Sequence, residues 1–122
     1  MAISNGLFLT AMANQTRGYH QKFPDHWDLL TRINYLQRKI ILCSIAYYEF
    51  DESPVSDYDY DQLSKDLAAM MKECENVGDS KYYYAFYDFD GSTGYHLYTR
   101  LTEIDREYLT VIAEGALADI RK

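Results

Sequence analysis

The sequence predicts a mainly α-helical fold, in which an antiparallel hairpin of two helices is followed by a C-terminal helix. Two stretches carry apolar residues at spacings of three and four, which is the period of an amphipathic helix. Asp51 and Pro54 interrupt the pattern between them, and a third such stretch closes the chain. Residues 82–90 fit a short strand, a short buried helix or an irregular segment, so the pattern leaves this part of the fold open.

The first predicted helix starts near residue 27, where Asp25 and Asp28 stand three apart as an N-terminal signal. It should end at 48–50, because Asp51 and Pro54 do not continue a helix. Its expected inward stripe consists of Trp27, Leu30, Ile33, Leu36, Ile40 and Ser44. The other faces are expected to carry Arg32, Arg38 and Lys39.

The second predicted helix starts at Asp57, because Ser56 is a natural N-cap and Asp59 can complete a capping box. It should stop before Gly78. Its expected inward stripe consists of Tyr60, Leu63, Leu67, Met70 and Cys74. The two helices are therefore expected to form an antiparallel hairpin over 27–77.

The C-terminal third is expected to contain a turn at 88–93, a short helix over 94–100 and a last helix over 102–121. Ser92 or Thr93 can cap the short helix, and Thr102 with Asp105 forms the capping signal of the last one. The residues expected to face inward on the last helix are Ile104, Tyr108, Val111, Ile112, Gly115 and Leu117.

The length of 122 residues suits one helical domain, expected over 24–122, with residues 1–23 as an N-terminal arm. The apolar run at the start of the arm has no preceding Lys or Arg and is too short for a signal peptide or a membrane span. We therefore expect a cytoplasmic protein that does not enter a membrane. His20 and His26 are expected at the surface, because no third ligand stands at metal spacing.

The charge of the chain argues against general nucleic-acid binding. Twelve Lys and Arg residues are outnumbered by nineteen Asp and Glu residues, which gives a net charge of −7. Phosphate contacts need a basic surface, so an acidic chain of this kind suits a cationic partner or serves solubility. Cys43 and Cys74 match no zinc spacing and are expected to be reduced thiols in the helical core.

The strongest candidate site lies where the two predicted hairpin helices meet. Tyr47 and Tyr48 end the first helix, while Asp57, Tyr60 and Asp61 share one face of the first turn of the second. The phenol rings could stack on a flat heterocycle, and the carboxylates could accept hydrogen bonds from an amide or ribose and complement a pyridinium cation. The alternative is structural: Tyr60 packs inside the hairpin and the aspartates satisfy the helix terminus.

Two other acidic motifs have weaker chemical interpretations. The segment 88–93 (Asp-Phe-Asp-Gly-Ser-Thr) looks like the nucleophile motif of haloacid-dehalogenase-type phosphatases. That chemistry needs a parallel sheet and later Lys and acidic sites, so a plain turn is the favoured interpretation. Asp57, Asp59 and Asp61 are spaced like the start of an EF-hand, but Gln62 and Ala68 stand where the loop needs Gly and Glu.

The hairpin also resembles a known family over roughly residues 30–74, about a third of the chain. The matching residues are Ala46-Tyr47-Tyr48, Asp51, Pro54, Ser56-Asp57, Tyr60-Asp61-Gln62-Leu63 and Lys65-Asp66-Leu67. They resemble the N-terminal Ia domain of NAD-dependent DNA ligases. In that family the hairpin grips the nicotinamide mononucleotide half of NAD, while a separate nucleotidyltransferase domain is adenylated.

The resemblance implies nucleotide contacts at Tyr47, Asp57, Tyr60 and Asp61. At a fifth position, where those ligases usually carry His, this chain has Tyr48, which departs from the family pattern. The resemblance also implies NAD or nicotinamide mononucleotide as the ligand, with no other cofactor required.

No Lys-x-Asp-Gly adenylation motif occurs in the sequence, so the chain lacks the nucleophile of ligase chemistry. We therefore expect a non-catalytic binding module, a stand-alone relative of the ligase Ia domain of the kind that phages encode. The competing hypothesis is an acidic phage anti-defence protein, of the anti-CRISPR kind, that inhibits a basic nucleic-acid-binding protein by contact. In either case the expected location is the cytoplasm of the host cell.

Overall fold

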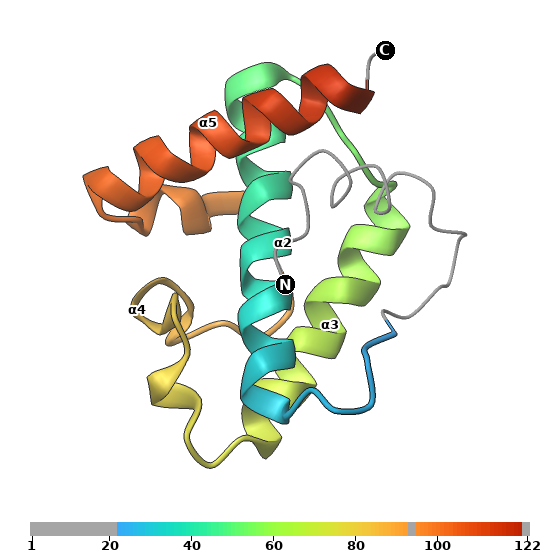
Figure 1. Ribbon diagram of the computed structural model, residues 1–122, viewed down its shortest axis with the longest axis vertical. Coiled ribbons are helices and arrows are strands. Elements are labelled where there is room, and N and C mark those ends of the chain that lie inside the picture. The colour runs from blue at the N-terminus through green and yellow to red at the C-terminus, as the bar shows by residue number, and fades with distance from the viewer. Residues whose placement is uncertain (1–21, 93–94, 121–122) are drawn as a thin grey trace.

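The computed structural model describes residues 22–92 and 95–120, and every regular element within these ranges is helical (Figure 1). This confirms the mainly α-helical prediction. The elements in chain order are α2 (Leu29–Phe50), α3 (Asp57–Glu73), the 3-10 helix η1 (Val77–Asp79), α4 (Tyr83–Phe86), the 3-10 helix η2 (Tyr95–Arg100) and α5 (Glu103–Ile120). The ambiguous segment 82–90 therefore forms a short helix followed by a turn. Most of the expected N-terminal arm, including His20, lies outside the described residues.

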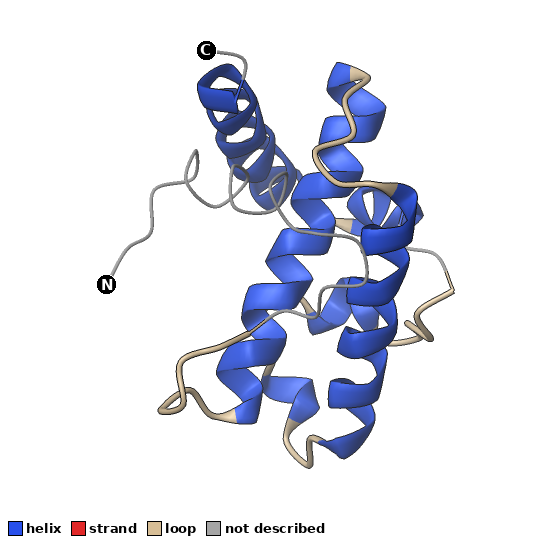
Figure 2. Cartoon of the chain, turned by 90° about the vertical axis from the view of Figure 1, so that its right-hand side faces the viewer, coloured by secondary structure: helices blue, strands red, loops and turns tan. Residues whose placement is uncertain are grey.

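Helix α2 is the centre of the molecule, and α3, α5 and η2 all contact it (Figures 1 and 2). Every residue from 39 to 46 is buried. A helix that is apolar all round belongs in the interior, and the run 40–46 has this character. The expectation that Lys39 lies on an outer face is therefore wrong, because its side chain is only 1% exposed.

Both ends of α2 are fixed by specific hydrogen bonds. Asp28 is the N-cap, and its Oδ1 accepts a hydrogen bond of 2.8 Å from the backbone N–H of Thr31. Trp27, expected on the inward stripe, lies before the helix and packs its ring against Phe23. At the other end, Asp51 adopts a left-handed conformation with φ of 52°, and its N–H donates to the carbonyl of Ala46. The helix therefore ends where Asp51 and Pro54 predict.

Helix α3 runs antiparallel to α2, as the hairpin prediction requires (Figure 1). Ser56 caps it, because its Oγ accepts a hydrogen bond of 3.1 Å from the N–H of Asp59. Asp59 itself is buried, and its Oδ1 has no hydrogen-bond partner among the described residues. The helix end at Glu73 lies before Gly78, as expected.

Helix α5 crosses α2, but it is rotated relative to the prediction. The N–H of Asp105 donates to Thr102 Oγ1 at 3.2 Å, which confirms the expected cap. Ile112 and Leu117 are buried as expected, whereas Ile104, Tyr108 and Val111 are exposed at 79%, 54% and 69%. The residues of α5 that are buried are Leu109, Ile112, Ala113, Ala116 and Leu117. Gly115, also expected inside, is exposed.

The segment between α3 and η2 is tied to the hairpin at several points, and the backbone N–H of Lys81 donates to Asn34 Oδ1 at 2.8 Å. Gln37, which is fully buried, donates from Nε2 to Ser80 Oγ at 3.0 Å, and its Oε1 accepts from the N–H of Tyr82 at 3.3 Å. Gly91 lies directly on α3, where an added Cβ would stand 3.1 Å from the Ser64 carbonyl oxygen.

In the part of the chain that the structure describes, none of the helices has the length and apolar character that crossing a membrane requires.

Candidate functional site

The predicted site lies at the corner where α2 ends and α3 begins. Tyr47 and Tyr48 occupy the last turn of α2, and Asp57, Tyr60 and Asp61 occupy the first turn of α3. These five residues are called the corner below. The helix ends that the sequence predicts therefore bring all five to one region of the fold, but their side chains point in different directions.

Tyr47 and Tyr60 line one small pocket at the corner. The other lining residues are Cys43, Glu52, Ser53, Pro54 and Val55. The pocket has a volume of only about 10 Å³, which is room for about one water molecule. Tyr60 is 7% exposed and belongs to the hydrophobic core, whereas Tyr47 is 46% exposed. The alternative in which Tyr60 packs inside the hairpin therefore describes its ring correctly.

Tyr48 is 50% exposed and joins a row of aromatic rings. Its ring stacks on Tyr98 of η2 with centroids 5.2 Å apart, and it meets Tyr47 edge-on at 5.1 Å. Burial, together with nearby Glu49, raises the pKa of Tyr98 above its ordinary value. We call Tyr47, Tyr48 and Tyr98 the tyrosine row. Sequence reasoning missed Tyr98, because no local pattern connects it with a helix end fifty positions earlier.

Neither aspartate of the corner lines the pocket. Asp57 is exposed to solvent. Asp61 Oδ2 forms an ion pair of 2.8 Å with Lys65 Nζ, one turn further along α3, and this pair raises the pKa of the lysine. The structure therefore places the two carboxylates at the surface around the corner, apart from the Tyr47–Tyr60 pocket.

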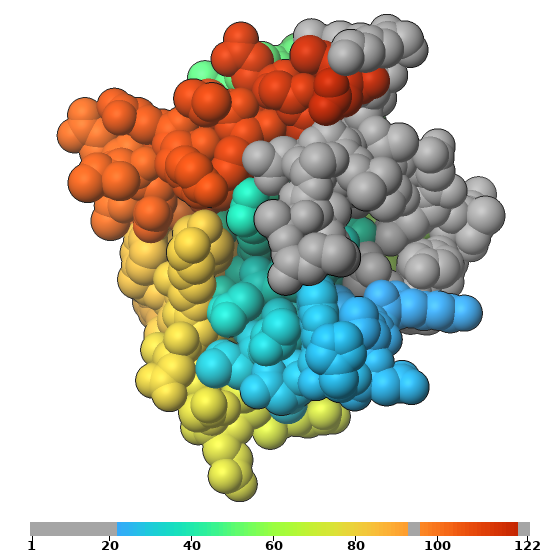
Figure 3. Space-filling view, in the orientation of Figure 1, coloured from blue at the N-terminus to red at the C-terminus, as the bar shows by residue number. Residues whose placement is uncertain are grey.

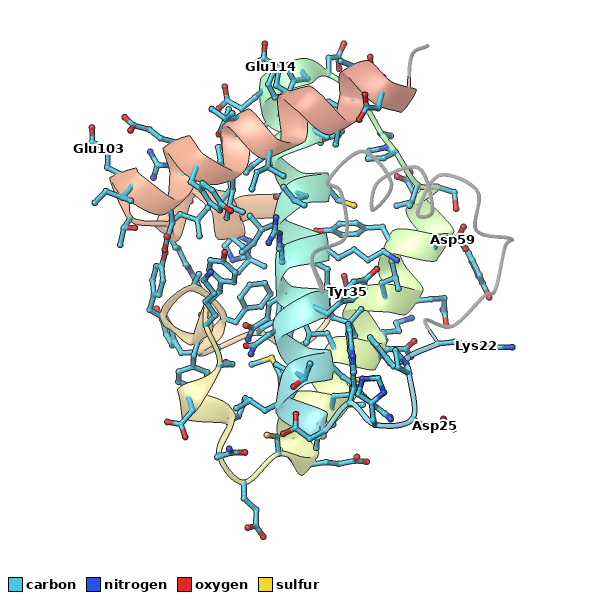
Figure 4. The ribbon with its side chains drawn as sticks, viewed as in Figure 1. Lys22, Asp25, Tyr35, Asp59, Glu103 and Glu114 are labelled. Carbon is cyan, nitrogen blue, oxygen red and sulfur yellow. The ribbon has the colours of Figure 1, made fainter. Side chains whose placement is uncertain are left out.

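The chain around the corner is strongly acidic. The stretch 47–61, which contains the corner, holds six Asp and Glu residues and no Lys or Arg. Of the six, only Asp59 is buried (labelled on α3 in Figure 4). A surface with charges of one sign raises the local concentration of cations and steers positively charged partners toward it.

Two ionisable groups on α2 lie beneath the corner. Burial raises the pKa of the Cys43 thiol to about 12, so the group is protonated at neutral pH. Burial lowers the pKa of Lys39 to about 8, although Cys43 and Asp59 act in the opposite direction. The continuous apolar run that follows Lys39 was the signal in the sequence that α2 is surrounded on all sides.

A second cavity of about 160 Å³ lies beside the turn after α4. It is lined by Asp88, Phe89, Asp90, Ser92, His96 and Leu97. Both aspartates are engaged: Arg100 forms two hydrogen bonds to Asp88, at 2.5 and 3.1 Å, and Asp90 Oδ1 accepts from Ser92 N–H and Oγ. The hydrogen bonds to Arg100 hold the pKa of Asp88 below its usual value.

These contacts support the turn interpretation of Asp88 and Asp90. A short helix, not a strand, precedes them, which differs from the architecture that the phosphatase motif requires. Cys43 and Cys74 are both free and buried, as expected for reduced thiols. Within 22–92 and 95–120, no group of three or more His, Cys, Asp or Glu side chains could hold a metal ion.

Comparisons of the chain with protein-family models, with curated proteins and with solved structures find no match. The resemblance to the ligase Ia domain therefore rests on the residues quoted for it, and the function has to be argued from the surface and the pockets described above.

Proposed function

We propose that this chain is a non-catalytic binding module that acts by contact with a positively charged protein partner. The observation that carries the proposal is the tyrosine row, in which Tyr47 and Tyr48 are about half exposed within a stretch of six carboxylates and no cation. Aromatic faces and carboxylates are the two groups that bind Arg and Lys side chains at protein surfaces.

The expected interaction is made of several modest contributions. A cation over an exposed aromatic ring contributes about 0.5–1 kcal/mol, and an exposed ion pair contributes no more than about 1 kcal/mol. Several such contacts together give a complex that forms quickly and weakens with salt. The buried thiol of Cys43, protonated at neutral pH, supports binding rather than nucleophilic chemistry at the pocket.

The test is a titration of the protein into a fluorescein-labelled arginine–glycine peptide, followed by fluorescence anisotropy at low and high salt. We expect binding that weakens with salt and that falls about fivefold or more in the Tyr48→Ser/Tyr98→Ser variant, because the aromatic faces are removed. The control is Tyr87→Ser, directly after α4, which removes a phenol that is 61% exposed from another surface. The proposal is contradicted if the Tyr48→Ser/Tyr98→Ser variant and the Tyr87→Ser control bind the peptide with equal affinity. It is also contradicted if the parent protein does not bind the peptide at low salt.

A second candidate is the binding of NAD or nicotinamide mononucleotide at the corner. The observation that favours it is that Tyr47 and Tyr60, both implied by the ligase resemblance, line one pocket. Small-molecule pockets usually measure about 300–1,000 Å³, whereas this one holds about 10 Å³. A nicotinamide ring could enter only if the side chains that line the pocket moved apart, and Tyr47 is the exposed aromatic residue among them.

Titration calorimetry with NAD and with nicotinamide mononucleotide separates the two candidates. We expect no heat at millimolar ligand, because a pocket of about 10 Å³ is too small for a nicotinamide ring. Heat that disappears in Tyr47→Ala would favour the nucleotide candidate. Tyr47 is the informative position, because replacing the buried Tyr60 would destabilise the core and remove binding for a trivial reason.

A further inference from the structure

Helix α5 has a second apolar face that nothing in the described chain covers. Ile104, Tyr108 and Val111 are exposed at 79%, 54% and 69%, and Gly115 and Ala118 continue the same line at the surface. We call these five residues the α5 seam. Helix α5 itself is the orange-to-red helix in Figure 3.

The seam has the spacing of a helix that packs lengthwise against another helix. Its positions are separated by four, three, four and three residues, which is the a/d pattern of a coiled-coil heptad. The opposite face of α5 is used already: Leu109, Ala113 and Ala116 are fully buried. The helix is therefore apolar on two sides, and only one of them contributes to the core of this chain.

Acidic residues flank the seam on both sides. Glu103, Glu107 and Glu114 lie along one edge, and Figure 4 shows Glu103 and Glu114 projecting outward from α5. Asp105 and Asp119 follow the other edge by the helical period. The basic residue within the described part of α5, Arg106, turns back and donates to the carbonyl oxygens of Thr99 and Leu101 at 2.9 and 3.3 Å.

A second copy of this chain fits the seam in shape but not in charge. If two α5 helices paired antiparallel about Val111, Tyr108 would lie opposite the small Gly115 of the other copy. The same register places Glu107 opposite Glu114 on the flank, twice per dimer. Like charges at the flanking positions of paired helices oppose association, so the carboxylates select a partner with the opposite charge.

We propose that the α5 seam is the docking surface for a basic amphipathic helix of a partner protein. The partner would present apolar side chains to Ile104, Tyr108 and Val111, and Lys or Arg residues to the flanking carboxylates. This inference rests on the proposed function, because both assume a positively charged partner protein. It adds that the segment of the partner that binds α5 is a helix. It uses a surface different from the tyrosine row, so the two can be tested separately.

The test uses three labelled synthetic peptides in anisotropy titrations against the intact protein. The first carries Leu at heptad positions a and d and Lys at e and g, the second replaces the Lys residues by Glu, and the third replaces the Leu residues by Ser. We expect only the first to bind, and we expect Ile104→Ser/Val111→Ser to weaken it by about tenfold or more. Both side chains are exposed, so the variant should keep the thermal stability of the parent.

The seam variant Ile104→Ser/Val111→Ser and the tyrosine-row variant Tyr48→Ser/Tyr98→Ser show which of the two surfaces binds the peptide. Unchanged binding in Tyr48→Ser/Tyr98→Ser, with loss in the seam variant, supports the inference. Equal binding of the Ser-substituted peptide, or unchanged binding by the seam variant, overturns it while leaving the tyrosine row to its own test with the arginine–glycine peptide. A dimer in light scattering that Val111→Glu converts to a monomer also overturns it, because the seam would then be occupied by a second copy.

Discussion

Replacing Gly91 by Ala should destabilise the protein by about 3 kcal/mol, one of the largest effects expected from a single methyl group. Gly91 has φ of +85°, a left-handed conformation that costs a residue with a Cβ about 1–2 kcal/mol. The new Cβ would also stand 3.1 Å from the Ser64 carbonyl oxygen and 3.2 Å from Ala68 Cβ. These atoms belong to α3 and cannot move individually, so the turn must shift away from the helix by a few tenths of an ångström, at a further cost of about 1–3 kcal/mol.

The matched control for this prediction is Gly78→Ala. No atom lies within 4 Å of a Cβ added to Gly78, and its φ is not positive. This change should alter the free energy of unfolding by less than about 0.5 kcal/mol. Urea denaturation followed by circular dichroism measures both variants. If they lose the same stability, the packing of the 88–92 turn on α3 is not as described.

The second large effect concerns the buried Lys39. Its pKa is lowered from 10.5 to about 8, mainly because burial disfavours the charged form. Between these two pH values the unfolded chain keeps a proton that the folded chain has released, so the contribution of Lys39 to stability rises with pH. The full rise amounts to about 3 kcal/mol, and below the folded pKa the cost of burying the charge is fully present.

The measurement compares the free energy of unfolding of the parent and of Lys39→Met at a series of pH values from neutral upward. Their difference should shift in favour of the parent as pH rises, because only the parent has a buried lysine that gives up its proton in the folded state first. Lys65→Met is the control, since Lys65 is exposed and pairs with Asp61 at the surface. A difference that stays flat with pH would mean that Lys39 titrates like a solvated lysine.

The sequence predicted the hairpin well because its signals are local. Asp28 and Ser56 cap the helices that follow them, and Asp51 ends α2. Each of these residues acts through hydrogen bonds to backbone groups within a few positions, so the pattern contains the information needed. The short run after Tyr82 was ambiguous because strand and helix propensities do not separate over so few residues.

The rotation of α5 and the burial of Lys39 could not be predicted in the same way. Both faces of α5 are apolar, and only its contact with α2 decides which face is buried. The apolar run 40–46 after Lys39 indicates that α2 is surrounded, but the elements that cover it are known only from the assembled fold.

The corner shows the same division between local and tertiary information. The five predicted positions do lie at the helix ends, but the direction of each side chain depends on more distant parts of the chain. Tyr48 turns to Tyr98 of η2, and Tyr60 enters the core that other helices complete. The positions were therefore predictable from the sequence, while the small size of the pocket and the tyrosine row were not.

The central place of α2 has a consequence for any attempt to shorten this protein. A fragment holding only the two hairpin helices would lack the cover that α5 and η2 give to α2, a helix in which every residue from 39 to 46 is buried here. An isolated helix of this kind gains little from propensity alone, so such a fragment should aggregate instead of forming a miniature receptor. Melting should accordingly proceed in one cooperative step, with the loss of α5 and the collapse of the hairpin as a single event.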